Sequence, residues 1–463
     1  MRHFLFICAG VAAAVLFSGP DVSAQTRTLR IATYNIEADI NGATTPLPGL
    51  IAPPSNTNNV QAGGVLEGIG EEIVGGDPAR PLDILALQET TSNPTTVAPI
   101  VNALNSFYAV PGMYSNSAYQ ATESGGFTGS GNGPNAIVFN AKTVQLLASV
   151  PVDPPGGTGN LGSSSGEYRE VMRYEFAPAG VAPATTNEFY VYVSHYKAST
   201  GTANENYRNG EAKIIRNDEA GNLPAAARVI YVGDYNVDNS GEPMYQTILS
   251  NTAPNGIHQG QGVDPLNLAG NPNINWGTST TDTNILVMLS EHSYNLEYRD
   301  DLQVMTTNVY YGAPGGLKYV PGSYHVFGNN GTTPYFGSVN SGSDTAMNNR
   351  LVTNGPVFIS AAQLYLDLTD ASDHLPVVAD YTIPIPAPVI TGVSLAETNL
   401  IFTVTNGITN AAYTVLMSTN VASPLANWLA VATNIATGGS FTLTATNAVN
   451  PAAPGQFYLL RSK

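Results

Sequence analysis

Six short apolar segments, each bordered by polar side chains at one end, restrict most strongly what this chain can fold into. The segment VIYVGDYN at residues 229–236 is an example, because β-prone residues lead to Gly233 and then to Asp234 and Asn236. The other five are TYNIE, LALQE, VSHYK, RDDL and SDHLPV, between residues 33 and 378. Helix-like stretches lie among the strands, at residues 64–74, 95–107, 204–216 and 243–249. Interleaved strands and helices predict a layered α/β fold.

The polar groups at these strand ends share one chemistry. Strand ends of a layered sheet meet at one rim, so we expect these side chains to lie close together. Carboxylate and amide oxygens are the ligands that Mg²⁺ prefers, and histidines stabilise charge or transfer protons. The candidates are Asn35, Glu37, Glu89, His195, Asp234, Asn236, Asp300, Asp301, Asp373 and His374. Such a set predicts hydrolysis at phosphorus by a metal-assisted water.

Asp234 and Asn236 allow more than one interpretation. In an extended strand they point to the same side, where they can hold a water or a phosphate oxygen. Asp and Asn after a glycine also commonly form a turn, and the residues alone leave this alternative open. An EF-hand calcium loop is excluded, because its sixth position would be Asn239 instead of Gly and its twelfth Tyr245 instead of Glu.

In their order along the chain, the six segments resemble the motifs of the endonuclease/exonuclease/phosphatase superfamily. That family includes pancreatic-type deoxyribonucleases, abasic-site endonucleases, bacterial sphingomyelinases and inositol-polyphosphate phosphatases. The resemblance implies a four-layer sandwich, in which helices flank two mixed β-sheets. It also implies that Glu89 is the principal Mg²⁺ ligand, with Asn35, Glu37 and Asp373 completing the metal environment. Mn²⁺ or Ca²⁺ could replace Mg²⁺.

The resemblance implies catalytic roles for five further residues. Asp234 would orient or deprotonate the attacking water, and Asn236 would bind water or phosphate. His195 and His374 would face the scissile phosphate, with Asp301 holding the His374 ring.

Two further assignments concern the aspartate that holds His374 and the arginine that contacts the substrate. RDDL offers both Asp300 and Asp301 as the partner of His374, and Asp301 is preferred because it directly precedes the apolar strand. Arg169 resembles the phosphate-contacting arginine of the family and is the predicted substrate-binding residue.

Residues 1–24 are predicted to be a cleaved signal peptide. Arg2 precedes an apolar stretch over residues 4–17, and small residues at 22–24 precede Gln25. The stretch is short for a membrane span, so an uncleaved anchor is the weaker alternative and no stable membrane insertion is predicted. The expected location is secreted, extracellular or periplasmic. The mature chain would lack cysteine, because Cys8 is the only one.

A composition break near residue 384 predicts a second domain. The catalytic domain is predicted over residues 26–383, a Pro-rich linker over 384–388 and a small β-sandwich module over 389–463. Apolar residues alternate with Thr, Ser and Asn in this module, and its only charged residues are Glu397, Arg461 and Lys463. Cell-surface attachment, polymer binding and help with export all remain open for it.

The overall charge restricts the partners. The net charge is −17 with only 17 Lys and Arg, and no basic run is present to bind phosphates without sequence preference. A nuclease remains possible, because bound cations supply positive charge locally. We therefore predict a secreted, Mg²⁺-dependent phosphodiesterase, a nuclease acting on extracellular nucleic acid. Alternatives are a sphingomyelinase-type phospholipase C, a phosphomonoesterase on sugar or inositol phosphates, and a binding module on an inactive scaffold.

Overall fold

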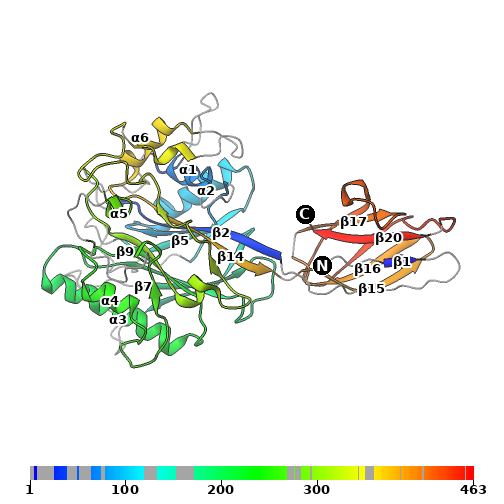
Figure 1. Cartoon of the computed structure of the whole chain (residues 1–463), viewed down its shortest axis with the longest axis horizontal. Helices are drawn as coiled ribbons and strands as arrows, with labels where there is room; N and C mark the ends of the chain where they lie inside the picture. Colours follow the sequence, from blue (N-terminus) through cyan, green and yellow to red (C-terminus); the bar gives the residue numbers. More distant parts are fainter. Residues whose placement is uncertain are drawn as a thin grey trace. The chain divides into compact units, whose positions relative to one another are not determined.

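The computed structural model shows a chain that divides into two compact units. The larger unit comprises Thr28–Phe176 and Thr185–Ile383, and the smaller comprises Met1–Arg27, Ala177–Ala184 and Pro384–Lys463 (Figure 1). The structure describes residues 5–7, 25–38, 49–51, 64–73, 79–118, 133–152, 171–267, 276, 283–291, 295–342, 344–349, 359–385, 387–408, 411–453 and 455–462.

Two mixed β-sheets form the centre of the larger unit. Their strands are β2 (Gln25–Asn35), β3 (Ile84–Gln88), β4 (Tyr114–Asn116), β5 (Ala136–Asn140), β6 (Val144–Val152), β7 (Val171–Pro178), β8 (Phe189–His195), β9 (Val229–Asp234), β10 (Gly262–Val263), β11 (Asp301–Thr306), β12 (Lys318–Tyr319), β13 (His325–Val326) and β14 (Val377–Ile385). One sheet has the order β10-β11-β9-β8-β7-β6; the other has the order β12-β14-β2-β3-β5-β4, with β13 on β14. Each contains a parallel pair, β8 with β9 and β2 with β3, among antiparallel ones.

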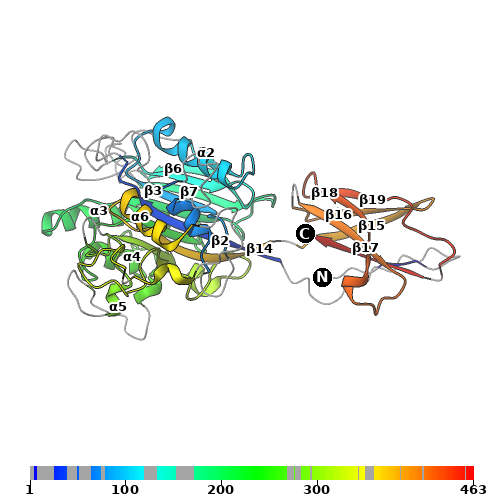
Figure 2. The ribbon, with the colours of Figure 1, turned by 90° about the horizontal axis from the view of Figure 1, so that it is seen from above.

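Helices cover both outer faces of the paired sheets. The α-helices are α1 (Val65–Gly70), α2 (Ala98–Phe107), α3 (Thr202–Asn222), α4 (Pro243–Leu249), α5 (Thr283–Leu286) and α6 (Ala361–Ala371). Figure 1 shows α1, α2 and α6 on one side of the sheets and α3 and α4 on the other, and Figure 2 shows α6 over the strands. The predicted four-layer α/β sandwich is confirmed.

The two sheets pack through buried apolar side chains and through polar side chains that bridge them, of which Gln303 is one. Val191, Ile230 and Val304 from one sheet, and Ile31 from the other, belong to a single buried core. Burying each such side chain stabilises the fold by about 1.5–3 kcal/mol. Gln303 of β11 donates to the carbonyl oxygens of Ile31, at 3.0 Å, and Val377, at 2.7 Å, across the interface. This packing brings the strand ends of both sheets to one rim.

The smaller unit is an antiparallel β-sandwich, as predicted for the C-terminal region. Its strands are β1 (Leu5–Ile7), β15 (Val389–Ala396), β16 (Asn399–Thr405), β17 (Ala412–Ser418), β18 (Leu429–Ile435), β19 (Phe441–Ala445) and β20 (Gln456–Ser462). The sheet orders are β1-β20-β17-β18 and β15-β16-β19. The alternating apolar residues Leu400, Phe402 and Val404 are buried, which gives this unit its own core.

Two sequence predictions concern the ends of these units. Residues 5–7, inside the predicted signal peptide, pair with β20, and cleavage of that peptide stays a prediction. The linker predicted at 384–388 begins within β14, which runs to Ile385. Among the described residues, no helix combines the length and apolarity that crossing a membrane requires.

Candidate functional site

The polar strand ends of both sheets meet at one rim. The parallel pairs place Asn35 beside Gln88 and His195 beside Asp234. Because β11 runs antiparallel to β9, its first residue, Asp301, also pairs with Asp234. The expected convergence of these side chains is therefore present in the structure.

Asn35 links the two sheets at the centre of the site. Its amide nitrogen Nδ2 donates to Glu89 Oε1 at 2.9 Å and to Asp234 Oδ2 at 3.0 Å. The same nitrogen lies 3.4 Å from His374 Nε2. The side chain is completely buried, so these contacts are shielded from water. A neutral donor between two carboxylates holds them together without adding charge.

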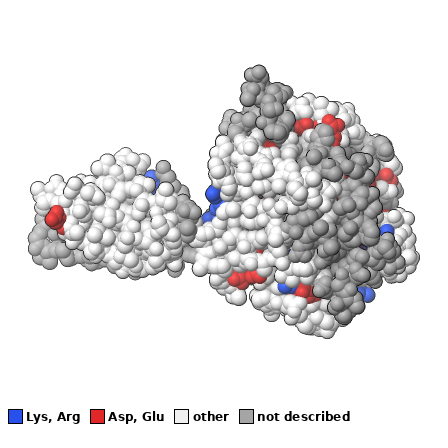
Figure 3. All heavy atoms as spheres, turned by 180° about the vertical axis from the view of Figure 1, so that it is seen from behind, with Lys and Arg blue, Asp and Glu red and all other residues white. Residues whose placement is uncertain are grey.

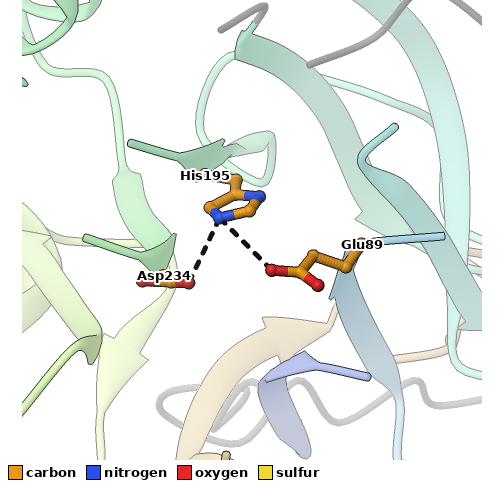
Figure 4. Close-up of side chains that lie close together, drawn as sticks. All are labelled: Glu89, His195 and Asp234. Carbon is orange, nitrogen blue, oxygen red and sulfur yellow. Dashed lines mark ion pairs between the residues drawn. The ribbon is translucent and has the colours of Figure 1, made fainter. Parts of the chain in front are cut away.

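Glu89, His195 and Asp234 form a candidate cation site. Each offers one ligand atom, and the three atoms lie within 4.8 Å of one another (Figure 4). His195 Nε2 lies 3.3 Å from Asp234 Oδ2 and 3.6 Å from Glu89 Oε1. Two buried carboxylates in this proximity need positive charge, and oxygen ligands with one imidazole suit a divalent cation. The residues present therefore fit the predicted metal.

Glu37 and Asp373, two further predicted metal ligands, are neighbours of each other and of His374. Asp373 Oδ1 is 3.7 Å from His374 Nε2, and the Asp373 side chain is 27% exposed. Partial burial, together with the negative charge of Asp373, raises the pKa of Glu37. The two carboxyl groups are thus neighbours that a cation would bring together, and their ligand role stays a prediction.

Asp301 holds the imidazole ring of His374. His374 Nδ1 donates to Asp301 Oδ2 at 2.7 Å, and Asp301 is completely buried. Burial favours the neutral ring, but the carboxylates of Asp301, Asp373 and Asp234 outweigh it and raise the pKa of His374 well above its usual value. The Nε2 atom of the ring faces the site, 3.9 Å from Asp234 Oδ2 and 3.7 Å from Asp373 Oδ1.

The competing residue, Asp300, has a different partner. Its buried carboxyl group forms a hydrogen bond with Glu291, and burial followed by the charge of Glu291 raises the pKa of Asp300 well above its usual value. A hydrogen bond between two carboxyl groups requires a shared proton. Asp301 and not Asp300 thus orients His374.

The segment GDYN forms a turn, which decides between the extended and the turn geometry that the sequence left open for Asp234 and Asn236. The strand ends at Asp234, and Asn236 has a positive φ of 46°. Asp234 Oδ1 accepts hydrogen bonds from the backbone N–H and the side-chain amide of Asn236, both at 2.9 Å. Oδ2 remains directed at Asn35 and His195. The turn and the functional interpretation are therefore compatible, because Oδ1 of Asp234 closes the turn while Oδ2 faces the site.

Three site residues have left-handed backbone conformations. Glu37, Glu89 and Asn236 have φ values of 48°, 54° and 46°, and each lies just beyond the end of a strand. Such conformations cost non-glycine residues free energy and concentrate at functional sites. Here they turn the chain sharply, so that both the strand end and the next residues face the same rim.

Three residues at the site were missed by the sequence analysis. Ser290 Oγ accepts from the Asp301 N–H at 2.9 Å, and Ser372 Oγ donates to the Asn35 carbonyl at 2.7 Å. Glu291 shares the proton with Asp300. Ser290 and Glu291 follow no strand-end pattern, so no sequence signal identified them. Arg169, the predicted substrate-binding residue, lies outside the described residues.

Comparisons with known proteins give structural similarity only. No protein-family model matches the chain, and no curated protein matches its sequence. The catalytic domain of human Nocturnin with bound sulfate is 17% identical, with a TM-score of 0.39, over 77% of this chain and 97% of that one. An endonuclease/exonuclease/phosphatase from Beutenbergia cavernae is 13% identical, with a TM-score of 0.36, over 94% of this chain and 99% of that one. D. rerio TDP2 complexed with a single strand DNA product is 12% identical, with a TM-score of 0.37, over 76% of this chain and 98% of that one.

Proposed function

We propose that the chain is a metal-dependent phosphoric ester hydrolase in which water attacks phosphorus directly. The observation that carries this proposal is the buried convergence of Glu89, His195 and Asp234 within 4.8 Å of one another. His374, whose pKa the neighbouring carboxylates raise, lies beside this cluster, and Asp301 holds its ring at 2.7 Å. Paired acids, a cation site and a charged imidazole are the groups that phosphoryl transfer to water requires.

The side chains divide this work between them. Glu89, with Asp234 and His195 beside it, would hold a divalent cation, which when bound would supply positive charge against the phosphate oxygens. Asp234 Oδ2 orients the attacking water and accepts its proton. His374 donates from Nε2 to a phosphate or leaving-group oxygen, because Nδ1 is already bonded to Asp301. Asn35 keeps Glu89 and Asp234 at hydrogen-bonding distance from one nitrogen.

The proposed substrate is the phosphodiester backbone of extracellular nucleic acid. The chain has only 17 Lys and Arg, and Figure 3 shows a face on which those described are few and scattered. Such a protein meets a phosphodiester mainly through its cation and histidines instead of a broad basic groove. Secretion, after cleavage behind Ala24, is part of the proposal and is tested by the mass of the exported chain.

Cleavage of supercoiled plasmid by the purified protein tests the activity. We expect nicking in Mg²⁺ that EDTA abolishes, and losses of at least about 100-fold in Asp234→Ala and His374→Ala. His258→Ala is the matched control, since His258 is exposed and bonds Thr252 instead of any site residue. The same proteins are tested on sphingomyelin and on small phosphate monoesters.

The outcomes test the substrate and the type of reaction separately. Hydrolysis of a lipid or monoester without nicking would mean that the protein is a sphingomyelinase-type phospholipase C or a phosphomonoesterase instead of a nuclease. No metal-dependent hydrolysis of any phosphate ester would overturn the proposed function, as would full activity in Asp234→Ala.

A further inference from the structure

Arg208 of α3 holds two loops through one guanidinium group. The side chain is completely buried. Its Nε and Nη2 donate to the two carboxylate oxygens of Glu242, each at 2.9 Å. Its Nη1 donates to the carbonyl oxygens of Lys197 and Ser199, each at 2.9 Å. Four hydrogen bonds from one planar group fix its partners in a geometry that lysine cannot reproduce.

Glu242 extends this contact to the loop that follows β9. Its Oε1 accepts a hydrogen bond from the backbone N–H of Asp238 at 2.8 Å, and its side chain is 2% exposed. The same guanidinium therefore anchors the loop after β8 and, through Glu242, the loop after β9. We call this ion pair the Arg208–Glu242 clamp.

The two anchored loops begin at site residues. The loop after β8 begins at His195, and the loop after β9 begins at Asp234. The Tyr196 N–H donates to the Asp234 carbonyl at 2.9 Å, and Asn236 Nδ2 donates to the Tyr196 carbonyl at 3.1 Å. The loops thus touch at the strand ends, and the clamp holds each of them a few residues further along.

We propose that the Arg208–Glu242 clamp is a positioning device for the cation site, which sets the separation of His195 and Asp234. Neither clamp residue bonds to a candidate ligand, so both act through the loop backbones. A functional constellation has to be held within about 0.5 Å, which ordinary surface loops do not achieve. Only the kcat and KM measurements for this proposal rest on the proposed function. The affinity for the cation is measured without a substrate, so it tests the clamp independently.

Arg216 offers a matched control on the same helix. It is also completely buried, and its Nη1 donates to the carbonyl oxygens of Thr247, Ile248 and Ser250 at 2.9, 3.0 and 2.9 Å. It lies about 12 Å further along the helix axis, by the rise of an α-helix. These acceptors belong to the end of α4 and the residue after it, and Nη2 also donates to the carbonyl oxygen of Gln259. Arg216→Lys therefore measures the general cost of altering a buried arginine in α3.

The test compares wild-type protein, Arg208→Lys, Arg216→Lys and the double variant Arg208→Met/Glu242→Met. For each we measure Tm, the Kd of Mn²⁺ by titration calorimetry, and kcat and KM. The double variant removes both charges of the clamp together, so its Tm is expected to fall less than if one of them were left buried and unpaired. In Arg208→Lys and the double variant we expect Kd to rise about 10–100-fold and kcat to fall by a similar factor.

The same three measurements give the result expected for the Arg216→Lys control and the results that would overturn the proposal. Arg216→Lys lowers Tm but keeps Kd and kcat within about twofold of wild type, since its contacts lie away from both loops. Wild-type Kd and kcat in a stable double variant would overturn the proposal, and so would equal losses in Arg208→Lys and Arg216→Lys. If wild type hydrolyses no phosphate ester, the proposed function fails, while the Mn²⁺ affinities still decide the role of the clamp.

Discussion

Asn35 shows how much of the site depends on the charge of one residue. Its amide nitrogen lies between the carboxylates of Glu89 and Asp234, at 2.9 and 3.0 Å. An aspartate has nearly the same shape but would place a third buried negative charge there. Like charges at this distance destabilise the fold unless a cation or proton neutralises them.

Asn35→Asp is therefore expected to lower Tm without metal and to show a larger gain in Tm on adding Mg²⁺ or Mn²⁺ than wild type does. The gain follows from linkage, because a cation binds the more negative site more tightly. Thermal unfolding with and without metal measures it, with Asn251→Asp on the exposed surface as the control. An equal metal-induced shift in Asn35→Asp and wild type would show that the cation binds elsewhere.

His325 provides a pH-dependent contribution to stability away from the site. Its Nε2 lies 2.6 Å from Glu72 Oε2, and although burial opposes the charged ring, the Glu72 carboxylate outweighs it and raises the pKa of His325. A raised folded-state pKa stabilises the fold fully below the ordinary value of about 6.5. That stabilisation is lost as the pH rises through the folded-state pKa.

We expect His325→Gln to lose about 1 kcal/mol near pH 6 and less near pH 9. Urea unfolding at the two pH values gives the difference, and His258→Gln is the exposed control. A loss that grows with pH would mean that the His325 ring is neutral in the folded protein.

The sequence predicted most of the individual site residues but not their neighbours. Asn35, Glu89, His195 and Asp234 follow directly from apolar segments, which is why the pattern identified them. Glu291 precedes no such segment, and it reaches the site only through the tertiary fold. The left-handed φ values could not be predicted either, because the backbone is held there by contacts distant in sequence.

At the scale of elements, Gly233 allows β8 and β9 to approach closely at the site. It has a φ of 145°, and an added Cβ atom would lie 1.9 Å from the Ser194 carbonyl oxygen. Ser194 pairs with Gly233 in the parallel ladder, one residue before His195 pairs with Asp234. A side chain at position 233 would therefore separate the two strands at the point where they deliver their ligands.

Gly233→Ala is expected to destabilise the protein by about 3 kcal/mol or more, from the steric clash and the strained φ together. Gly221→Ala in α3 is the control: an added Cβ there meets no atom within 4 Å, so about 0.5–1 kcal/mol of stabilisation is expected. Chemical denaturation compares the two. Similar stabilities in both variants would contradict the close approach of β8 and β9.

The elements themselves were largely predictable, whereas their pairing was not. Apolar runs and helix-like stretches predicted β3, β8, β9 and α2 to α4, although α3 extends to Asn222, beyond the predicted end at residue 216. Strand order and register depend on contacts between distant segments, as when Asp301 pairs with Asp234. Local propensity holds no information on such pairing, so strand order and register were not predicted, and the expectation of two mixed sheets came from the family resemblance alone.

At the scale of the whole molecule, the scarcity of basic residues predicts how the enzyme meets its substrate. A net charge of −17 leaves little to neutralise phosphates beyond the site itself. We expect log KM for DNA to rise with log salt with a slope of about 2 or less, since each phosphate contact contributes about 0.9. Steady-state kinetics between about 50 and 200 mM salt at fixed Mg²⁺ measure the slope. A slope of about 6 or more would reveal an extended cationic surface and contradict binding through the site alone.

The central claim is that Glu89, with His195 and Asp234 beside it, holds a divalent cation at the junction of the two sheets. Anomalous scattering from a crystal of the protein soaked in Mn²⁺ tests it most directly. We predict one strong peak about 2.0–2.3 Å from a carboxylate oxygen of Glu89, with Asp234 and His195 around it, that Glu89→Gln removes or weakens. A peak at another carboxyl cluster, such as Glu291 and Asp300, or no peak at saturating Mn²⁺, would contradict the claim.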